Sequence, residues 1–251
     1  MPVAIFVLGA PVWLHWFEPL TFLTINAWGA PVAAHVWAGF SLFGNGWAIL
    51  GVTSPLLVLA PRLMLSWLCA APFVILFARG GKFLIESPRP AMVVDNALIR
   101  IIGEPKHFVA MPSGHTLTAF AVVCAIYFSI PKGRRLNYAW LWLFAAAVGI
   151  SRITVGAHWP GDVVVGVSLG VLSGMAGIVV AQRLSPAHFA VTSWAMRAVA
   201  VLVVFSVYHL LFEKLGFAEN LYLQMLLAAL ATASLVAFVW CNLQAHRKPA
   251  G

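Results

Sequence analysis

The sequence predicts an all-α protein, a polytopic bundle of transmembrane helices. Of its 251 residues, 62% are hydrophobic and only 9% are charged, whereas a soluble domain is nearer half apolar and a quarter charged. Several apolar runs are long enough to cross a bilayer as helices. These runs are continuous and do not alternate with polar residues, which excludes a membrane-spanning β-barrel. The lipid bilayer is therefore the expected solvent of this chain.

Short polar turns separate the predicted spans, and one long polar stretch, residues 81–111, separates the second from the third. The spans are expected at residues 46–60, 63–80, 113–130, 137–151, 161–182, 194–212 and 221–241. We expect a single membrane-embedded domain, residues 1–251, with a six-helix core. The core, at about 44–183, carries the polar motifs, and extra C-terminal spans follow at about 190–242.

Two N-terminal segments lack the pattern of a full span. Residues 3–16 are apolar but short, so they form either a first span or an uncleaved signal-like segment. Residues 17–43 mix aromatic side chains with polar ones such as Asn26 and His35. This mixture favours a segment that is irregular or that lies in the membrane interface, with Trp28 and Trp37 at the depth of the headgroups.

The distribution of charges orients the predicted bundle. Alternating the spans puts eight basic residues and no acidic residue at or near one face, while all seven acidic residues fall on the other. The eight are Arg62, Lys132, Arg134, Arg135, Arg183, Arg197, Arg247 and Lys248. Because loops rich in Lys and Arg stay in the cytoplasm, residues 81–111 are expected to face outward. In a bacterial inner membrane this face is the periplasmic one.

Composition also argues against several classes of partner. The formal net charge is +8, but the basic residues are scattered between apolar runs without an RNA-binding motif, so nucleic acid is not expected. Cys69, Cys124 and Cys241 each lie inside an apolar run, as buried free thiols do. We expect no metal and no cofactor, and the sequence leaves the oligomeric state open.

Three polar clusters lie at the outward ends of the predicted spans. Charged residues at membrane depth are costly, and they are therefore usually paired and functional. The clusters are Lys82 with Arg89-Pro90 after six residues, Pro112-Ser113-Gly114-His115, and Ser151-Arg152 with His158 after five residues and Asp162 after three more. Alternation of the spans brings all three to the same face of the bundle.

The residue types in these clusters suit a phosphoryl group. Lys82, Arg89 and Arg152 supply three cations, and arginine can bind phosphate through two parallel hydrogen bonds. A proline at position 112 is well placed to begin a helix. Ser113 and Gly114 would then offer free backbone N–H groups at the positive end of that helix, where anions bind readily.

Two histidines and one carboxylate complete the clusters. Asp162 lies four residues after His158, close enough to orient its ring, and His115 on another span is free for acid–base chemistry. These residues alone leave open which histidine is the nucleophile. Lys106 and His107 are expected to be solvated loop residues and Glu86 a charge at the rim of the site.

Taken together, the three clusters resemble the signature of the type 2 phosphatidic acid phosphatase superfamily. That signature is Lys-x6-Arg-Pro, Pro-Ser-Gly-His and Ser-Arg-x5-His-x3-Asp, and residues 82–162 match each position in order. The apolar surroundings are similar to the membrane-bound branch of the family. The resemblance implies metal-independent hydrolysis of a lipid phosphate or diphosphate.

The resemblance also implies a role for each residue of the signature. His158 would attack phosphorus and form a phosphohistidine, Asp162 would orient it, and His115 would protonate the leaving group. The phosphate would be bound by Lys82, Arg89, Ser113, Gly114 and Arg152.

The identity of the substrate stays open within this resemblance. The first hypothesis is an isoprenoid carrier diphosphate such as undecaprenyl diphosphate. The second is lipid A, as a phosphatase or as a carrier-to-lipid A phosphotransferase, and the third is phosphatidylglycerol phosphate or phosphatidic acid. A transporter with an anion site is a remote alternative, because the polar clusters lie at span ends and not near the middle of the membrane.

Overall fold

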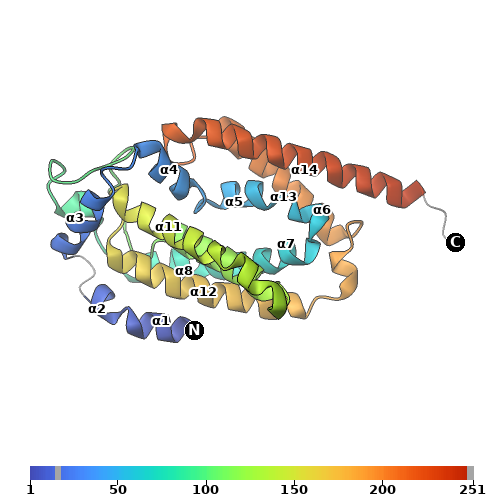
Figure 1. Ribbon diagram of the computed structural model, residues 1–251, viewed down its shortest axis with the longest axis horizontal. Coiled ribbons are helices and arrows are strands. Elements are labelled where there is room, and N and C mark those ends of the chain that lie inside the picture. The colour runs from blue at the N-terminus through green and yellow to red at the C-terminus, as the bar shows by residue number, and fades with distance from the viewer. Residues whose placement is uncertain (15–17, 248–251) are drawn as a thin grey trace.

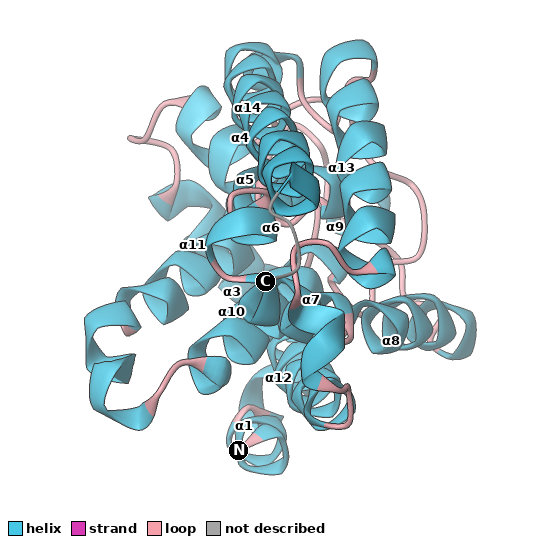
Figure 2. Ribbon diagram, turned by 90° about the vertical axis from the view of Figure 1, so that its right-hand side faces the viewer, coloured by secondary structure: helices cyan, strands magenta, loops and turns pink. Residues whose placement is uncertain are grey.

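The computed structural model describes residues 1–14 and 18–247, and every regular element in these ranges is a helix (Figures 1 and 2). The α-helices are α1 (Pro2–Leu8), α2 (Ala10–Trp13), α3 (Pro19–Trp28), α4 (Ala34–Leu42), α5 (Gly46–Thr53), α6 (Leu56–Leu59), α7 (Pro61–Leu68), α8 (Ala71–Leu84), α9 (Pro90–Val93), α10 (Gly114–Ser129), α11 (Trp140–Thr154), α12 (Pro160–Gln182), α13 (Trp194–Phe212) and α14 (Leu221–Arg247). Three 3₁₀ turns are η1 (Lys132–Tyr138), η2 (Pro186–Phe189) and η3 (Ala218–Asn220).

The predicted transmembrane bundle is confirmed. Within the described residues, four helical stretches are long and apolar enough to cross a membrane: Pro61–Leu84, Pro160–Gln182, Pro186–Phe212 and Ala218–Ala245. A fifth is obtained if η1 and α11, which meet at a bend of 44°, count as one span. Helix α10 is also apolar but shorter. The protein is therefore an integral membrane protein.

The N-terminal third differs from the sequence prediction. The expected span 46–60 is two short helices, α5 and α6, because Pro55 cannot donate a backbone hydrogen bond within a continuous helix. Residues 18–43, the described part of the expected 17–43 segment, are not irregular, since α3 and α4 occupy most of them. Residues 3–14 form α1 and α2, which are each too short to span a membrane. The last residues of the expected 3–16 segment, and Lys248, lie outside the described residues.

Helix α12 is the most buried of these four spans, with half of its apolar window buried against about a third or less for the others. A stripe of glycines, Gly166, Gly170 and Gly174, faces α10. A Cβ atom at Gly170 would lie 2.6 Å from the backbone oxygen of Leu117, so the two helices touch backbone to backbone. This close approach fixes the start of α10 against the start of α12.

The remaining helices pack against this pair or against one another (Figure 1). Helices α1 and α2 lie along α12, α4 packs on α11, and the hairpin of α13 and α14 packs on α5. A buried apolar cluster that includes Leu57, Met64 and Met196 joins this hairpin to α6 and α7. As a result, the C-terminal ends of α8 and α11 and the N-terminal ends of α10 and α12 meet at one end of the bundle.

Candidate active site

His158 and Asp162 form a buried pair at this end of the bundle. His158 follows the turn after α11, in which Gly156 adopts a φ of +77° that favours glycine. Its Nδ1 atom lies 3.1 Å from Oδ2 of Asp162, which is in the first turn of α12. The same carboxylate oxygen accepts the backbone N–H of Trp159 at 2.9 Å. Asp162 therefore fixes both the ring and the backbone of this segment, which leaves Nε2 to face the site.

Arg89 lies directly against His158. Its Nη1 atom donates to the backbone oxygen of Ala157 at 2.6 Å and lies 3.2 Å from Nε2 of His158. The fully buried Trp159 ring holds the two segments together, because its Nε1 donates to the oxygen of Pro88 at 2.7 Å. The Nε atom of Arg89 is buried without a partner among the described residues, so this guanidinium keeps a donor for a ligand.

Arg152 is held by two residues that lie far away in the sequence. Its Nη1 atom donates to the hydroxyl of Ser41 on α4. Its guanidinium lies over the ring of Phe217, 6.0 Å from the centroid, in the loop between α13 and α14. The side chain is almost fully buried, and its Nε atom has no partner in the part of the chain that the structure describes. A second guanidinium with an unpaired donor thus lies beside the His158–Asp162 pair.

The start of α10 differs in detail from the prediction. Pro112 does not begin the helix, because α10 starts at Gly114 with Ser113 as the preceding cap residue. The N–H of Ser113 is not free, since it donates to the backbone oxygen of Asp162 at 3.0 Å. The Ser113 N–H reaches the Asp162 oxygen because α10 packs closely on α12. The N–H of Gly114 has no acceptor among the described residues, so this first turn can still bind an anion.

His115 and Lys82 complete the group. A Cβ atom at Gly44 would lie 2.4 Å from Cβ of His115, so the segment between α4 and α5 supports that residue from behind. Lys82 is in the last turn of α8. The preceding residue, Gly81, packs so closely on Pro112 that a Cβ atom would lie 2.6 Å from it. The structure thus brings together every site residue that the sequence predicted.

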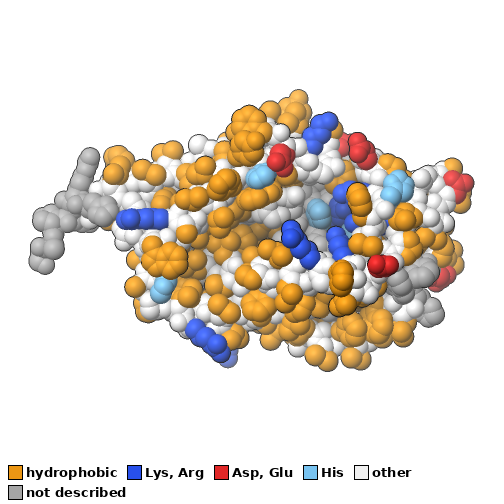
Figure 3. Space-filling view, turned by 180° about the vertical axis from the view of Figure 1, so that it is seen from behind, with side chains coloured by type: hydrophobic (Ala, Val, Ile, Leu, Met, Phe, Trp, Pro, Cys, Tyr) orange, Lys and Arg blue, Asp and Glu red, His pale blue; other side chains and the backbone are white. Residues whose placement is uncertain are grey.

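One loop residue proves closer to the site than expected. Lys106 is half-buried and not fully solvated, and its charge acts on Arg152, Arg89 and Lys82. The surface shows the result: a hollow in an apolar face gathers Lys and Arg side chains around a histidine (Figure 3). By contrast, His107 and Glu86 are exposed, as predicted.

The excess of positive charge has electrostatic consequences. Burial, and then the charges of Arg89, Arg152 and Lys82, hold the pKa of His158 well below its usual range. Burial and the same three cations lower the pKa of Lys106 to about 8. Burial also lowers the pKa of Arg89, against the opposing effect of Asp162. His158 is therefore neutral at neutral pH, with Nε2 able to act as a nucleophile, in a pocket suited to an anion.

Sequence reasoning missed three residues that shape the site. Ser41 and Phe217 contact Arg152, and neither belongs to a motif with fixed spacing. Asn26, expected at the interface, is buried: its Nδ2 donates to the oxygens of Arg100, Ile153 and Thr154. It thus ties α3 to the end of α11. Ser41 and Asn26 are polar residues inside apolar surroundings, which is a weak signal, and Phe217 has no signal in the sequence.

Two further features of the described ranges bear on the chemistry. Ser151 donates to the oxygen of Val148 at 2.6 Å, so its hydroxyl is occupied within its own helix. No group of three or more His, Cys, Asp or Glu side chains in these ranges is arranged to hold a metal ion.

Comparison with known proteins finds several relatives that match part of this chain. Over 80 residues it is 42% identical to the bacitracin transport permease protein BcrC of Bacillus licheniformis, covering 32% of this chain and 37% of that protein. Over 68 residues it is 43% identical to the lipid A 1-phosphatase of Porphyromonas gingivalis, covering 26% and 15%. Over 137 residues it is 29% identical to the undecaprenyl-diphosphatase of Sulfolobus acidocaldarius, covering 52% and 62%. The matches thus span less than two thirds of each relative.

The fold has a counterpart among solved structures. A transmembrane PAP2-type phosphatidylglycerolphosphate phosphatase from Bacillus subtilis superposes with a TM-score of 0.54 at 21% identity, covering 74% of this chain and 98% of that one. The family model described as the PAP2 superfamily matches residues 60–186, half of the chain. The fold, the motifs and this match agree, and the chain belongs to the PAP2 superfamily.

Proposed function

We propose that the protein is a membrane enzyme that hydrolyses a lipid phosphate or diphosphate through a phosphohistidine on His158. The observation that carries the proposal is the buried His158–Asp162 pair beside two arginines whose Nε donors lack partners among the described residues. An anion site alone does not need a histidine oriented by a carboxylate. Together with the family, this pair favours hydrolysis over transport.

In the first step, Nε2 of the neutral His158 attacks phosphorus. A P–N bond forms while the P–O bond to the lipid breaks, and His115 gives its proton to the leaving oxygen. Asp162 accepts the hydrogen bond of Nδ1 and stabilises the positive charge that develops on the ring. Lys82, Arg89, Arg152 and the N–H of Gly114 bind the phosphoryl oxygens, which is typically the largest contribution to catalysis.

In the second step, water replaces the lipid. His115, now neutral, removes a proton from the water as it attacks phosphorus, and the P–N bond breaks. Inorganic phosphate leaves, and both histidines return to their starting states. This sequence needs no metal ion, so activity is expected to persist in EDTA.

An isoprenoid carrier diphosphate such as undecaprenyl diphosphate is the substrate we favour. The similarity to the undecaprenyl-diphosphatase of Sulfolobus acidocaldarius supports it, as it covers about half of this chain. Lipid A is the second candidate, as hydrolase substrate or as phosphate acceptor. Similarity to lipid A 1-phosphatases supports it as well. Phosphatidylglycerol phosphate or phosphatidic acid is the third.

Phosphate release from a panel of lipids tests the activity and the substrate together. Purified protein in detergent and EDTA is given undecaprenyl diphosphate, phosphatidic acid, phosphatidylglycerol phosphate and lipid A. We expect release that is fastest from undecaprenyl diphosphate, and a fall in kcat of about 10⁴-fold or more in His158→Ala. The half-buried His188, which lies in η2 outside the three clusters, provides a matched control, because His188→Ala should keep wild-type activity.

The possible outcomes separate the parts of the proposal. Release from lipid A alone would replace the substrate but keep the mechanism. Equal release by wild-type protein and His158→Ala would refute the phosphohistidine. Absence of release from every lipid, also after an acceptor lipid is added, would refute the enzyme.

We further propose that the site faces the outside of the inner membrane, as the distribution of basic residues favours. Two exposed residues at opposite ends of the bundle test this, Phe108 in the loop beside the site and Leu136 in η1. In a background without native cysteines, Phe108→Cys should react with an impermeant maleimide added to spheroplasts. Leu136→Cys should react only after lysis, and the reverse pattern would invert the topology.

A further inference from the structure

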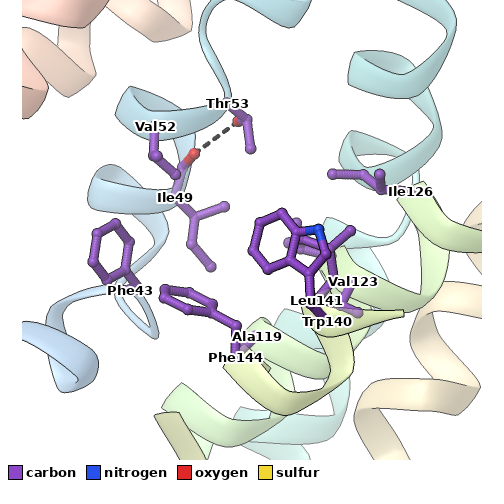
Figure 4. Close-up of a pocket in the computed structure, with 11 residues that line it drawn as sticks. Phe43, Ile49, Val52, Thr53, Ala119, Val123, Ile126, Trp140, Leu141 and Phe144 are labelled. Atoms are coloured by element: carbon purple, nitrogen blue, oxygen red, sulfur yellow. Dashed lines mark hydrogen bonds between the residues drawn. The ribbon is translucent and has the colours of Figure 1, made fainter. Parts of the chain in front are cut away.

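An apolar groove of about 330 Å³ lies between α5, α10 and α11 (Figure 4). Ala119, Val122 and Ile126 of α10 form its floor, and Ile49, Val52 and Phe144 stand along its sides. The hydroxyl of Thr53, one of the few polar groups in the lining, donates to the backbone oxygen of Ile49 at 2.7 Å. The groove therefore offers apolar surface to whatever occupies it.

The groove begins one helical turn from His115. Ala119, Val122 and Ile126 follow His115 at spacings of four, seven and eleven residues, which place them on the same face of α10. Phe43, which also lines the groove, precedes the Gly44 that packs on His115. The ring of Phe43 contacts the ring of Phe144, with 5.1 Å between their centroids, at the end of the groove nearer His115. The groove and the phosphate site thus share one continuous helix face.

We propose that this groove binds the hydrocarbon chain of the lipid whose oxygen leaves phosphorus at His115. The inference rests on the proposed function and extends it to the part of the substrate that does not react. Because His115 must reach the leaving oxygen, the hydrocarbon chain that this oxygen carries begins near His115 and continues along the adjoining apolar face. The oxygen carries the chain directly in a lipid monophosphate and through the remaining phosphate in a lipid diphosphate.

The dimensions favour a single lipid chain over a helix of a partner protein. From His115 to Ile126 the rise along α10 is about 16 Å, roughly half the hydrocarbon thickness of a bilayer. This is the depth that the chain of a lipid in the same leaflet would reach. An α-helix with its side chains is about 10 Å wide, which is too thick for a groove of this volume and length.

Filling the groove tests the inference without touching the site. Val52→Trp on α5 places a large side chain in the groove, and Val201→Trp on the exposed face of α13 is the matched control. The substrates are undecaprenyl diphosphate in mixed micelles and dimethylallyl diphosphate, which has the same reacting group but a chain too short to reach Val122. We expect KM for the long substrate to rise about tenfold in Val52→Trp, with no change for the short one.

Each alternative result has a separate meaning. A wild-type protein that cleaves neither diphosphate would exclude isoprenoid diphosphates as substrates, and cleavage of no lipid of the panel would refute the proposed function. Normal wild-type activity with equal loss, or no loss, on both substrates in Val52→Trp would refute the groove alone. If Val52→Trp fails to fold, a long-chain diphosphate with a photoreactive diazirine midway along its chain is cross-linked to His158→Ala protein. Labelled peptides from α5, α10 and α11 are expected, and labelling confined to other helices would overturn the inference.

Discussion

The family-matched segment, residues 60–186, and the segments that flank it contribute differently to the site. The matched segment contains all the residues to which we assign chemistry, from Lys82 to Asp162. The flanking segments contain residues that hold them: Ser41 and Phe217 contact Arg152, and Gly44 packs behind His115. One wall of the apolar groove, α5, also lies outside the match.

The matched segment thus supplies the residues to which we assign chemistry, and the flanking segments position these residues. A motif can keep its residue types while the flanking helices change the exact placement of a guanidinium or the shape of a groove. We therefore expect substitutions in the matched segment to lower kcat by large factors. Substitutions in the flanks should instead tune catalysis by small factors or change which lipid is accepted.

Arg152→Lys should give the largest effect in this comparison. Lysine keeps the positive charge but loses the planar fork that can contact Ser41 and phosphate at once. We expect kcat to fall about 10²- to 10³-fold, measured as phosphate release from the preferred lipid. Arg183→Lys, an exposed residue on the opposite side of the bundle, should leave kcat unchanged. An Arg152→Lys protein with near-normal kcat would show that charge alone is enough.

Phe217→Leu should give a smaller loss, although it lies outside the matched segment. Leucine keeps most of the buried apolar surface but removes the aromatic face under Arg152. A cation–π contact contributes about 0.5–2 kcal/mol, so kcat/KM should fall about 3- to 30-fold. Phe217→Tyr should restore most of the activity because it restores the ring. Phe212→Leu, at an exposed position of the same hairpin, is the control.

If Phe217 had only a packing role, the outcome would be different. Phe217→Leu and Phe217→Tyr would then lower thermal stability in proportion to the lost contacts, without the recovery of kcat/KM in the tyrosine variant. The loop before the second motif would also respond, because Gly103 packs closely on the Phe217 ring.

The sequence predicted which polar residues come together better than it predicted the residues that hold them in place. Charged residues at span ends, together with alternating spans, were enough to bring Lys82, Arg89, Arg152 and His158 together. Pro55 was a visible signal for the break in the 46–60 segment. Ser41 and Phe217 carried no such signal, because a contact between residues more than sixty positions apart depends on how α4 and the α13–α14 hairpin pack. The hydrogen bond from Ser113 to Asp162 likewise depends on the packing of α10 on α12.

Lys106 should give the smallest effect, visible mainly as a dependence on pH. Its pKa of about 8 lies below the ordinary value for lysine, so its charge is present at neutral pH and is lost as pH rises through about 8. If this charge helps to bind the substrate phosphate, KM should rise above that pH while kcat changes little.

Lys106→Arg stays charged and should remove the rise. Lys106→Gln should raise KM about threefold at neutral pH, a typical loss for a partly exposed charge, and should also flatten the profile. Lys132→Gln, on the opposite side of the bundle, should keep the wild-type profile. A wild-type dependence of KM on pH in Lys106→Gln would mean that the charges of the site lower the pKa of Lys106 but that Lys106 does not contribute to binding.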